Sequence, residues 1–480
     1  MTAPLPPAER KPLPPGFLDQ VRAVIGDRLG TGEAVRLQHG SSETHFDPVL
    51  PDAVAFVHST EEVATLVRLC VAAEVPVIAF GAGTSLEGNI TPVRGGLTID
   101  LSEMNAIVEV NSEDFDCTVQ AGVRREQLNE YLRDQGLFFP IDPGANATIG
   151  GMASTRASGT NAVRYGTMRD AVLSLKVVTP GGRILRTARR ARKSAAGYDL
   201  TRLMIGAEGT LGIITEVTLR LHGIPEAISS AVCSFETLKG AVDTVVQSIQ
   251  IGVPVARIEI LDDAQMRACN AYSKLDYPEK TTLLFEFHGS ERHVQEQVET
   301  VRAIAGQNGG GEFRWSNLPE ERNRLWKARH EAYYAAINQR PGSVGWTTDV
   351  CVPIGRLAEC IVDTKRDIAG SAVPATIVGH VGDGNFHVVF AIDPHRPEEM
   401  LEVEAINDRL VARALAMDGT CTGEHGIGLG KQRFLLDELG DAVDMMRLIK
   451  RAIDPKDLFN PGKIFQFQND IHAQAGKDSP

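Results

Sequence analysis

The chain has 480 residues, 43% hydrophobic and 23% charged, and these values exclude a disordered or fibrous protein. Its net charge of −13 argues against nucleic acid as a partner, because that role needs a basic surface. The seven cysteines contain no CxxC pair and favour a reducing compartment, and no apolar run is long enough to span a membrane. We expect a soluble cytoplasmic protein of roughly two to four domains, and peripheral contact with the inner membrane is left open.

The first half of the chain mixes helical and extended patterns. Residues 1–15 are rich in proline and are expected to form a flexible arm. Apolar residues at helical spacing predict a helix at 61–73 with Thr60 as its N-cap. Strands are predicted at 75–80, 96–101 and 117–122, a helix at 124–136 that Gly136 closes, and a hairpin at 173–187 around a Pro-Gly-Gly turn.

The second half of the chain has a different character. From about residue 224 to about 420, long amphipathic helical patterns alternate with strands such as 281–289. This pattern predicts an α+β domain with an antiparallel sheet. Glycine-rich turns return between about 421 and 465, and the polar tail at 467–480 is expected to be disordered.

Three glycine-rich segments lie within the first half of the chain. GAGTSLEGN (81–89) follows a predicted strand, but it has neither the Rossmann spacing nor a Walker A lysine. Taken alone it is equally consistent with an ordinary turn. The segments at 143–166 and 206–215 are also built from glycine and other small residues. Together the three predict a cradle that holds a large flat ligand by backbone contacts.

Histidines and a carboxylate occur in two further glycine-rich turns. His380 and His387 flank a Gly-Asp-Gly-Asn turn between apolar runs, which is a hairpin signal, and Glu424 and His425 lie in the turn at 421–431. Two imidazoles with one carboxylate form a common ligand set for a divalent catalytic ion. The alternative is that these are ordinary surface histidines, since a pair seven residues apart can arise by chance.

The order of these motifs resembles a known family. The three glycine segments resemble the FAD-binding domain of the vanillyl-alcohol oxidase and p-cresol methylhydroxylase superfamily. With GHVGDGNFH, CTGEHGIG, WTTDVCVP and NPGK added, the chain resembles the FAD-linked D-2-hydroxyacid dehydrogenases, above all the cytochrome-type D-lactate dehydrogenase group. The resemblance implies a two-domain α+β flavoprotein. It would comprise a vanillyl-alcohol-oxidase-type FAD-binding domain (16–222), an α+β cap domain with an antiparallel sheet (223–420), and a segment (421–466) that returns to the FAD domain and active site.

The resemblance also implies which residues bind FAD. The first loop would hold the pyrophosphate, the second the isoalloxazine and ribityl groups, and the third the adenosine. The implied residues are Phe80, Gly81, Ala82, Gly83, Thr84, Ser85, Gly88 and Asn89; Pro143, Gly144, Thr148, Ile149, Gly150, Gly151, Ser154, Gly159, Tyr165 and Gly166; Glu208, Gly209, Ile213 and Ile214; and Asn460. Neither of the first two loops contains His or Cys, so non-covalent FAD is expected.

Carried over by position, the family's catalytic set falls on the second half of the chain. His380, His387 and Glu424 would hold a divalent ion, zinc or manganese. Asn385 would hydrogen-bond the substrate carboxylate or hydroxyl, and His425 would be the general base. Oxidation of a 2-hydroxy acid removes the hydroxyl proton and a hydride from Cα, so a base and a hydride acceptor are both needed.

An anionic substrate in an acidic protein needs an arginine. A helical pattern covers residues 325–336 and the few residues before it. One face of this pattern carries Arg322, Trp326, Arg329 and Tyr333. For Arg322 a surface position is the simpler interpretation. The W-x-x-R pattern matches the family arginine that clamps the substrate carboxylate, which would be Arg329.

Within the family that the chain resembles, the residue type at one position differs between enzymes for dicarboxylic and monocarboxylic substrates. Hydroxyglutarate-type relatives carry a lysine two positions before the aspartate that corresponds to Asp349, and this chain has Thr347 there. A neutral side chain favours a monocarboxylic substrate.

We therefore expect oxidation of D-lactate to pyruvate, with FAD reoxidised by cytochrome c, a quinone or an electron-transfer flavoprotein; a homodimer is also considered. The alternatives are a glycolate-oxidase-type flavin subunit of a multi-protein complex, a D-2-hydroxyglutarate dehydrogenase, or a non-redox flavoprotein such as an ether-lipid synthase. The His/His/Glu set disfavours the last of these.

Overall fold

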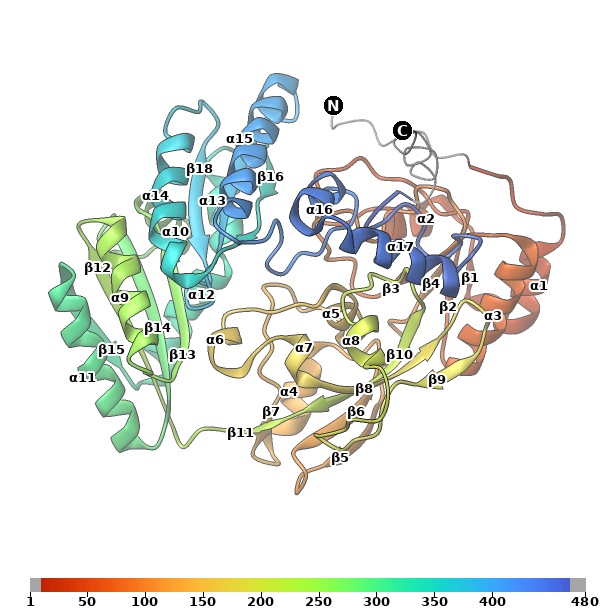
Figure 1. Ribbon diagram of the computed structural model, residues 1–480, viewed down its shortest axis with the longest axis horizontal. Coiled ribbons are helices and arrows are strands. Elements are labelled where there is room, and N and C mark those ends of the chain that lie inside the picture. Colours follow the sequence, from red (N-terminus) through yellow and green to blue (C-terminus); the bar gives the residue numbers. More distant parts are fainter. Residues whose placement is uncertain (1–9, 467–480) are drawn as a thin grey trace, which may run out of the picture.

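The computed structural model describes residues 10–466 (Figure 1). Residues 1–9 of the expected arm and the expected tail at 467–480 lie outside this range. Residues 10–15 form no helix or strand, and Arg10 pairs with Asp52. Within residues 10–466, no helix has both the length and the apolar character needed to cross a bilayer.

The N-terminal domain begins with a small α/β layer. Its four-stranded sheet has the order β1-β2-β4-β3, with β2 and β3 parallel to β4 and β1 antiparallel to β2. The elements are α1 (Phe17–Ile25), β1 (Leu29–Gly30), α2 (Glu33–Gly40), β2 (Ala53–Phe56), α3 (Thr60–Ala73), β3 (Val77–Phe80) and β4 (Leu97–Asp100). The predicted cap of α3 is wrong by one residue, because the Ser59 side chain, not Thr60, accepts from the Glu62 backbone N–H.

A five-stranded antiparallel sheet, β5-β6-β10-β8-β9, completes this domain. Its elements are β5 (Ile107–Asn111), β6 (Asp116–Gln120), α4 (Arg125–Arg133), β7 (Leu137–Phe138), α5 (Ile149–Thr155), α6 (Ala162–Tyr165), α7 (Met168–Ala171), β8 (Val172–Val178), β9 (Ile184–Arg186), α8 (Leu200–Met204), β10 (Ile213–Arg220) and β11 (His222–Gly223). The glycine-rich segment at 143–166, expected to be a loop, contains two short helices, because Thr148 caps α5 and the small residues of α5 pack tightly against the sheet.

The second domain is built on an eight-stranded antiparallel sheet in the order β15-β12-β14-β13-β18-β19-β16, with β17 paired to β19. Its elements are β12 (Ala227–Phe235), α9 (Leu238–Gln250), β13 (Val255–Leu261), α10 (Asp263–Ser273), β14 (Thr281–Gly289), α11 (Glu291–Gln307), β15 (Gly310–Ser316), α12 (Pro319–His330), α13 (Ala332–Asn338), β16 (Val344–Thr347), β17 (Val350–Cys351), α14 (Leu357–Ile368), β18 (Ala375–Gly379), β19 (Asn385–Ile392) and α15 (Pro397–Leu415). The expected antiparallel α+β architecture is confirmed.

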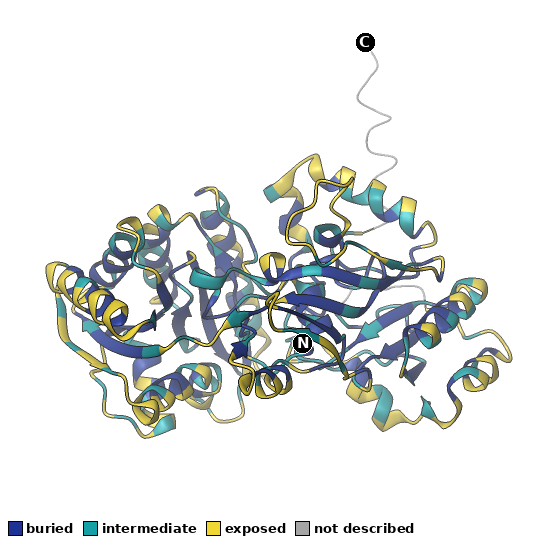
Figure 2. Cartoon of the chain, turned by 90° about the horizontal axis from the view of Figure 1, so that it is seen from below, coloured by how far each residue is buried: buried dark blue, intermediate teal, exposed yellow. Residues whose placement is uncertain are grey.

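The two faces of this large sheet have different partners. Helices α9, α11, α14 and α15 bury one face in the main hydrophobic core, whereas α10, α12 and α13 pack on the other. Side chains alternate along each strand accordingly, with Phe386, Val388 and Phe390 in the main core and His387 and Val389 on the opposite face. Figure 2 shows the inner strands of both domains buried and the outer helix surfaces exposed.

The chain then returns to the N-terminal domain. Helices α16 (Gln432–Leu439) and α17 (Ala442–Ile453), which the glycine pattern did not predict, lie over that domain in Figure 1. Beyond them, Phe459 forms a parallel bridge with Val77 at the edge of the first sheet.

Candidate active site

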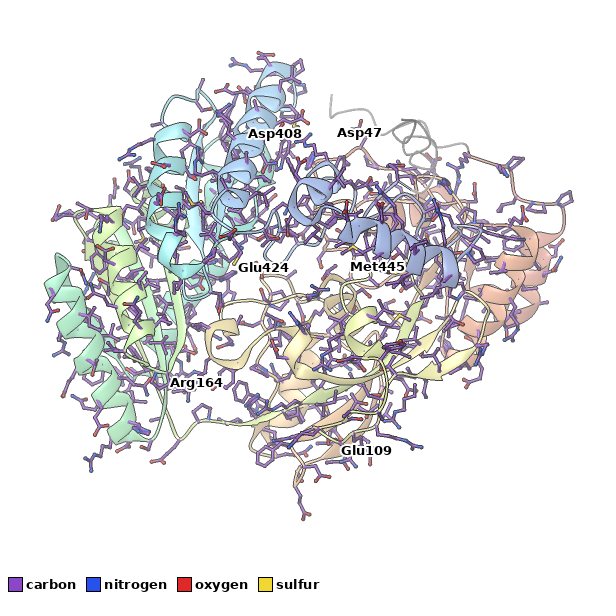
Figure 3. All side chains as sticks on the ribbon, viewed as in Figure 1. Asp47, Glu109, Arg164, Asp408, Glu424 and Met445 are labelled. Carbon is purple, nitrogen blue, oxygen red and sulfur yellow. The ribbon has the colours of Figure 1, made fainter. Side chains whose placement is uncertain are left out.

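A cavity of about 330 Å³ lies between the two domains. The glycine segments form one side, and residues of α12, α13, β18 and β19 form the other. Figure 3 shows Glu424 on the C-terminal segment between the two domains. The cavity is therefore built from parts of the chain that are far apart in the sequence.

Most of the expected FAD-binding residues line this cavity. They are Phe80, Gly81, Ala82, Gly83, Thr84, Ser85, Asn89, Pro143, Gly144, Thr148, Gly150, Gly151, Ser154, Glu208, Gly209, Ile214 and Asn460. Six others do not line it: Gly88, Ile149, Gly159, Tyr165, Gly166 and Ile213. Tyr165 instead hydrogen-bonds His288 Nδ1 at 2.7 Å, because α6 carries it toward the large sheet.

The cradle suits a large ligand that makes many backbone contacts. A Cβ on Gly81 would lie 2.3 Å from Thr148 Oγ1, so the first two glycine loops are in contact there. Ser85 Oγ and Asn460 Oδ1 are buried, line the cavity and have no hydrogen-bond partner. Buried polar atoms normally find a partner, so these two atoms fit a ligand with polar groups along its length, as FAD has.

Glu208 joins this cradle to the C-terminal segment. Its carboxylate accepts from the backbone N–H groups of Ile427 (2.7 Å) and Gly428 (2.9 Å) and from Asn89 Nδ2 (2.7 Å). Asn460 Nδ2 donates to the carbonyls of Asn89 and Glu208. The Glu208 side chain therefore holds the returning segment against the first glycine loop.

The predicted metal ligands converge at the far side of the cavity. His380 directly follows β18, and His387 lies in β19 across the hairpin. Their Nε2 atoms lie 3.2 and 3.3 Å from Glu424 Oε1, and the three ligand atoms lie within 4.8 Å of one another. This donor set and spacing fit a small divalent ion with positions left open for a substrate. The ligand roles stay a prediction.

A second cluster, formed by Asp349, His387 and His425, shares His387 with the first. Here Lys431 Nζ lies 3.5 Å from Asp349 Oδ2, which also accepts the Glu424 and His425 N–H groups at 2.9 Å. The Lys431 ammonium, which also lies 3.1 Å from Glu87 Oε1, balances part of the negative charge of Asp349. Asp349 therefore holds the turn that carries Glu424 and His425, and the first cluster is the better cation site.

The charges at the site perturb each other strongly. Burial acts to lower the pKa of His380, but the carboxylates of Glu259 and Glu424 raise that pKa well above its usual value. Burial acts to raise the pKa of Glu424, but His380 and His387 lower that pKa well below its usual value. Each ion therefore stabilises its neighbour in a site largely withdrawn from water.

His425 has the surroundings of a neutral imidazole. Its ring stacks on His387 with centroids 5.2 Å apart, and its Nδ1 is buried without a hydrogen-bond partner. Burial lowers the pKa of His425 to about 4. It also lines the cavity, so it can accept a proton from a bound molecule.

Asn385 does not lie at the cavity, contrary to the expectation that it contacts substrate. Its Nδ2 donates to Asp349 Oδ1 at 2.8 Å and to the Val350 carbonyl at 2.9 Å. At the first position of β19, its side chain faces β17 and the turn at 421–425. Asn385 therefore supports Asp349.

Arg329 lines the cavity near the end of α12, as expected of a carboxylate clamp. Its guanidinium pairs with Glu259 Oε2, at 2.7 Å from Nε and 2.6 Å from Nη2. Sequence reasoning missed Glu259. A lone acidic residue at an inward-facing position of the strand RIEIL was the available signal, since a buried charge requires a partner. Arg322, interpreted as a surface residue, does not line the cavity.

The part of the cavity beyond His387 is mostly uncharged. Thr347 of β16 pairs with Val389 of β19, and Val378 of β18 pairs with His387. Thr347, Val378, Val389 and Tyr333 all line the cavity, together with one acidic residue, Glu43. Thr347 Oγ1 is buried without a hydrogen-bond partner.

Residues 51–188 match the family described as "FAD binding domain", and residues 224–464 match "FAD linked oxidases, C-terminal domain". The chain belongs to the FAD-linked oxidase family. Solved structures agree at the level of fold. A p-cresol methylhydroxylase has a TM-score of 0.79 at 17% identity, with 96% of this chain and 99% of that one covered. An alkyldihydroxyacetonephosphate synthase has a TM-score of 0.76 at 21% identity, with 96% and 89% covered. The expected two-domain fold and FAD-linked superfamily are confirmed.

Several relatives of this FAD-linked oxidase share much more of its sequence. A probable mitochondrial D-lactate dehydrogenase of Danio rerio is 52% identical over 93% of this chain and 90% of its own length. The mitochondrial D-lactate dehydrogenase (cytochrome) of Arabidopsis thaliana is 46% identical, over 95% and 81%. The glycolate oxidase subunit GlcD of Bacillus subtilis is 34% identical, over 93% and 96%.

The expected cytoplasmic location is wrong. The relatives from Danio rerio, Arabidopsis thaliana, Saccharomyces cerevisiae and Kluyveromyces lactis all carry "mitochondrial" in their names. Composition and unpaired cysteines indicate a reducing environment but do not distinguish one such compartment from another.

Proposed function

We propose that this FAD-linked oxidase converts D-lactate to pyruvate and passes the electrons to a cytochrome-type acceptor. The main support is the convergence of His380, His387 and Glu424 on the cavity that the glycine loops also line. Relatives that are 44–52% identical are named D-lactate dehydrogenases, some with the cytochrome designation.

The residues of the chain divide the chemistry between them. When bound, FAD supplies the hydride acceptor and the divalent ion supplies a Lewis acid for the substrate oxygens. Arg329 binds the substrate carboxylate with the guanidinium donors that Glu259 leaves available. His425 accepts the hydroxyl proton on its buried imidazole. The two domains enclose the cavity from opposite sides.

The residues at the end of the cavity near Thr347 favour a substrate with a single carboxylate. Thr347 places no positive charge there, and Val378 and Val389 add an apolar wall. A second carboxylate would lose its hydration without gaining a cation, so lactate is favoured over 2-hydroxyglutarate. Thr347→Lys should raise kcat/KM for D-2-hydroxyglutarate relative to D-lactate, and an unchanged ratio would contradict this assignment.

The first experiment is anaerobic mixing of the FAD-loaded protein with D-lactate, L-lactate, glycolate and D-2-hydroxyglutarate, while the flavin absorbance is followed. The proposal expects rapid bleaching by D-lactate alone. Faster bleaching by glycolate, or activity only with added partner chains, would instead favour a GlcD-type subunit, in line with the 34% identity to that protein.

His425→Ala tests the proton acceptor. The variant should retain FAD and bind oxalate, a non-reacting analogue, while D-lactate bleaches its flavin about 10²–10⁴-fold more slowly. Bleaching at the wild-type rate would remove His425 from the role of base.

A further inference from the structure

Glu259 joins two parts of the site that have separate roles. It lies in β13, its side chain is 0% exposed, and each of its carboxylate oxygens has a different partner. Oε1 lies 2.8 Å from His380 Nδ1, and Oε2 lies 2.7 Å from Arg329 Nε and 2.6 Å from its Nη2. One buried carboxylate therefore connects the predicted metal ligand with the predicted carboxylate clamp.

The contact with His380 decides which ring nitrogen faces the metal site. With Nδ1–H donated to Glu259, Nε2 faces Glu424 Oε1, 3.2 Å away, and donates its own proton to that carboxylate; a bound cation would take the place of this proton. A carboxylate in this position fixes both the tautomer and the ring orientation of a metal-binding histidine, and it increases the basicity of the free nitrogen.

The contact with Arg329 decides which edge of the guanidinium is free. Glu259 Oε2 accepts from Nε–H and lies 2.6 Å from Nη2, so it occupies the Nε–Nη2 edge of the guanidinium. Within residues 10–466, no side chain or carbonyl accepts from Nη1, which carries two of the five guanidinium N–H donors, and Arg329 lines the cavity. The remaining donors are therefore available to an anion there.

We propose that Glu259 is a positioning residue that orients His380 and Arg329 together, so that metal binding and carboxylate binding are coupled through one side chain. This inference rests on the proposed function, because it treats the His380 cluster as a cation site and Arg329 as an anion site. A fully buried carboxylate is costly unless it is paired, and here both partners belong to the site.

Glu259→Gln keeps the shape of the side chain but removes its charge and one acceptor. In the FAD-loaded full-length variant, the dissociation constant for Mn²⁺, measured by equilibrium dialysis without substrate, should rise about 10–100-fold. The dissociation constant for oxalate, measured from the flavin spectrum, should also rise. In the wild-type protein Mn²⁺ should tighten oxalate binding, and the variant should lose this coupling.

Glu286→Gln is the matched control. Glu286 is also buried between a histidine and an arginine, at 2.8 Å from His288 Nε2 and 3.5 Å from Arg257 Nε, but it does not line the cavity. This variant should lower thermal stability to a similar degree while its affinity for Mn²⁺ stays unchanged. Equal losses of Mn²⁺ affinity in both variants would mean that Glu259 acts through general stability, and would overturn the inference.

Arg329→Met should change the affinity for Mn²⁺ in the opposite direction to Glu259→Gln. Without the guanidinium, Glu259 acts on His380 alone and a nearby positive charge is gone, so Mn²⁺ should bind several-fold more tightly while oxalate binds more weakly. Misfolding would weaken both. The inference would be overturned if Glu259→Gln bound Mn²⁺ and oxalate with wild-type affinities. If Glu259→Gln failed to fold, an unchanged Mn²⁺ affinity in Arg329→Met would overturn it instead. Absence of Mn²⁺ and Zn²⁺ binding by the wild-type protein would overturn the proposed metal site as well.

Discussion

Buried carboxylates organise the site residue by residue, and each one holds groups that are distant in the sequence. Asp349 accepts the backbone N–H groups of Glu424 and His425, Glu259 binds His380 and Arg329, and Glu208 accepts N–H groups of the C-terminal segment. Hydrogen bonds to a charged acceptor contribute about 1.5–3 kcal/mol each. Such carboxylates stabilise the precise placement of their partners, which catalysis requires.

Acid should destabilise the protein through His45. Its ring stacks on Trp346 with centroids 4.1 Å apart, and burial lowers the pKa of His45 to about 4. Between pH 6.5 and 4 the unfolded chain binds a proton that the folded chain does not, so the free energy of unfolding falls as the pH falls, by at most about 1.4 kcal/mol per pH unit. Above pH 6.5 this contribution is constant.

Urea denaturation at pH 7, 6 and 5 checks this expectation. His45→Phe keeps an aromatic ring beside Trp346 and removes the titrating group. Its free energy of unfolding should fall less steeply with pH than that of the wild-type protein. Parallel pH dependences would show that His45 is not responsible.

At the scale of elements, the turns between strands and helices carry the chemistry. The β18–β19 hairpin brings His380 and His387 together, as its Gly-Asp-Gly-Asn turn predicts. The second glycine segment contains α5, a feature the composition did not reveal, because the close contacts of its glycines with the sheet exist only after folding. At Gly150 a Cβ would lie 2.6 Å from the Ala121 Cβ.

Gly81→Ala should disrupt the cradle where its first two loops meet. The new Cβ would lie 2.3 Å from Thr148 Oγ1, the atom that caps α5, so the two loops must separate. We expect about 1–3 kcal/mol of lost stability and a reduced ratio of FAD to protein, measured from absorbance after purification.

Gly306→Ala is the control, because a Cβ at this position in α11 meets nothing within 4 Å. It should keep the full FAD content and be slightly more stable, since alanine favours the helix. Full FAD content in Gly81→Ala would show that the contact between the two loops does not shape the cofactor site.

At the scale of the whole molecule, the active site depends on the C-terminal segment, which packs back on the N-terminal domain. The segment that begins at Cys421 contributes Glu424 and His425, contacts the cap through Asp349, and contacts the N-terminal domain through Glu208. The two domains and this segment therefore meet beside the cavity, which residues of all three parts line.

Glu208→Ala should loosen that junction. It removes a buried acceptor of two backbone N–H groups and of Asn89, and we expect a loss of at least about 3 kcal/mol. Scanning calorimetry should show a lower Tm, together with a lower FAD content. Glu236→Ala, at an exposed ion pair with Lys280 in the second domain, should change neither. A Tm in Glu208→Ala equal to that of Glu236→Ala would contradict this role.

Local patterns were sufficient for much of this protein. Short apolar runs predict strands, glycine-rich runs after strands predict loops against a ligand, and the hairpin signal predicts that His380 and His387 meet, because all of these depend on neighbours in the chain. Tertiary structure alone decided the rest. Glu259, Asp349 and Lys431 acquire their roles from partners 36 to 121 residues away, and Asn385 faces Asp349 because of strand pairing. A buried charge is defined by what surrounds it, and no local pattern records those surroundings.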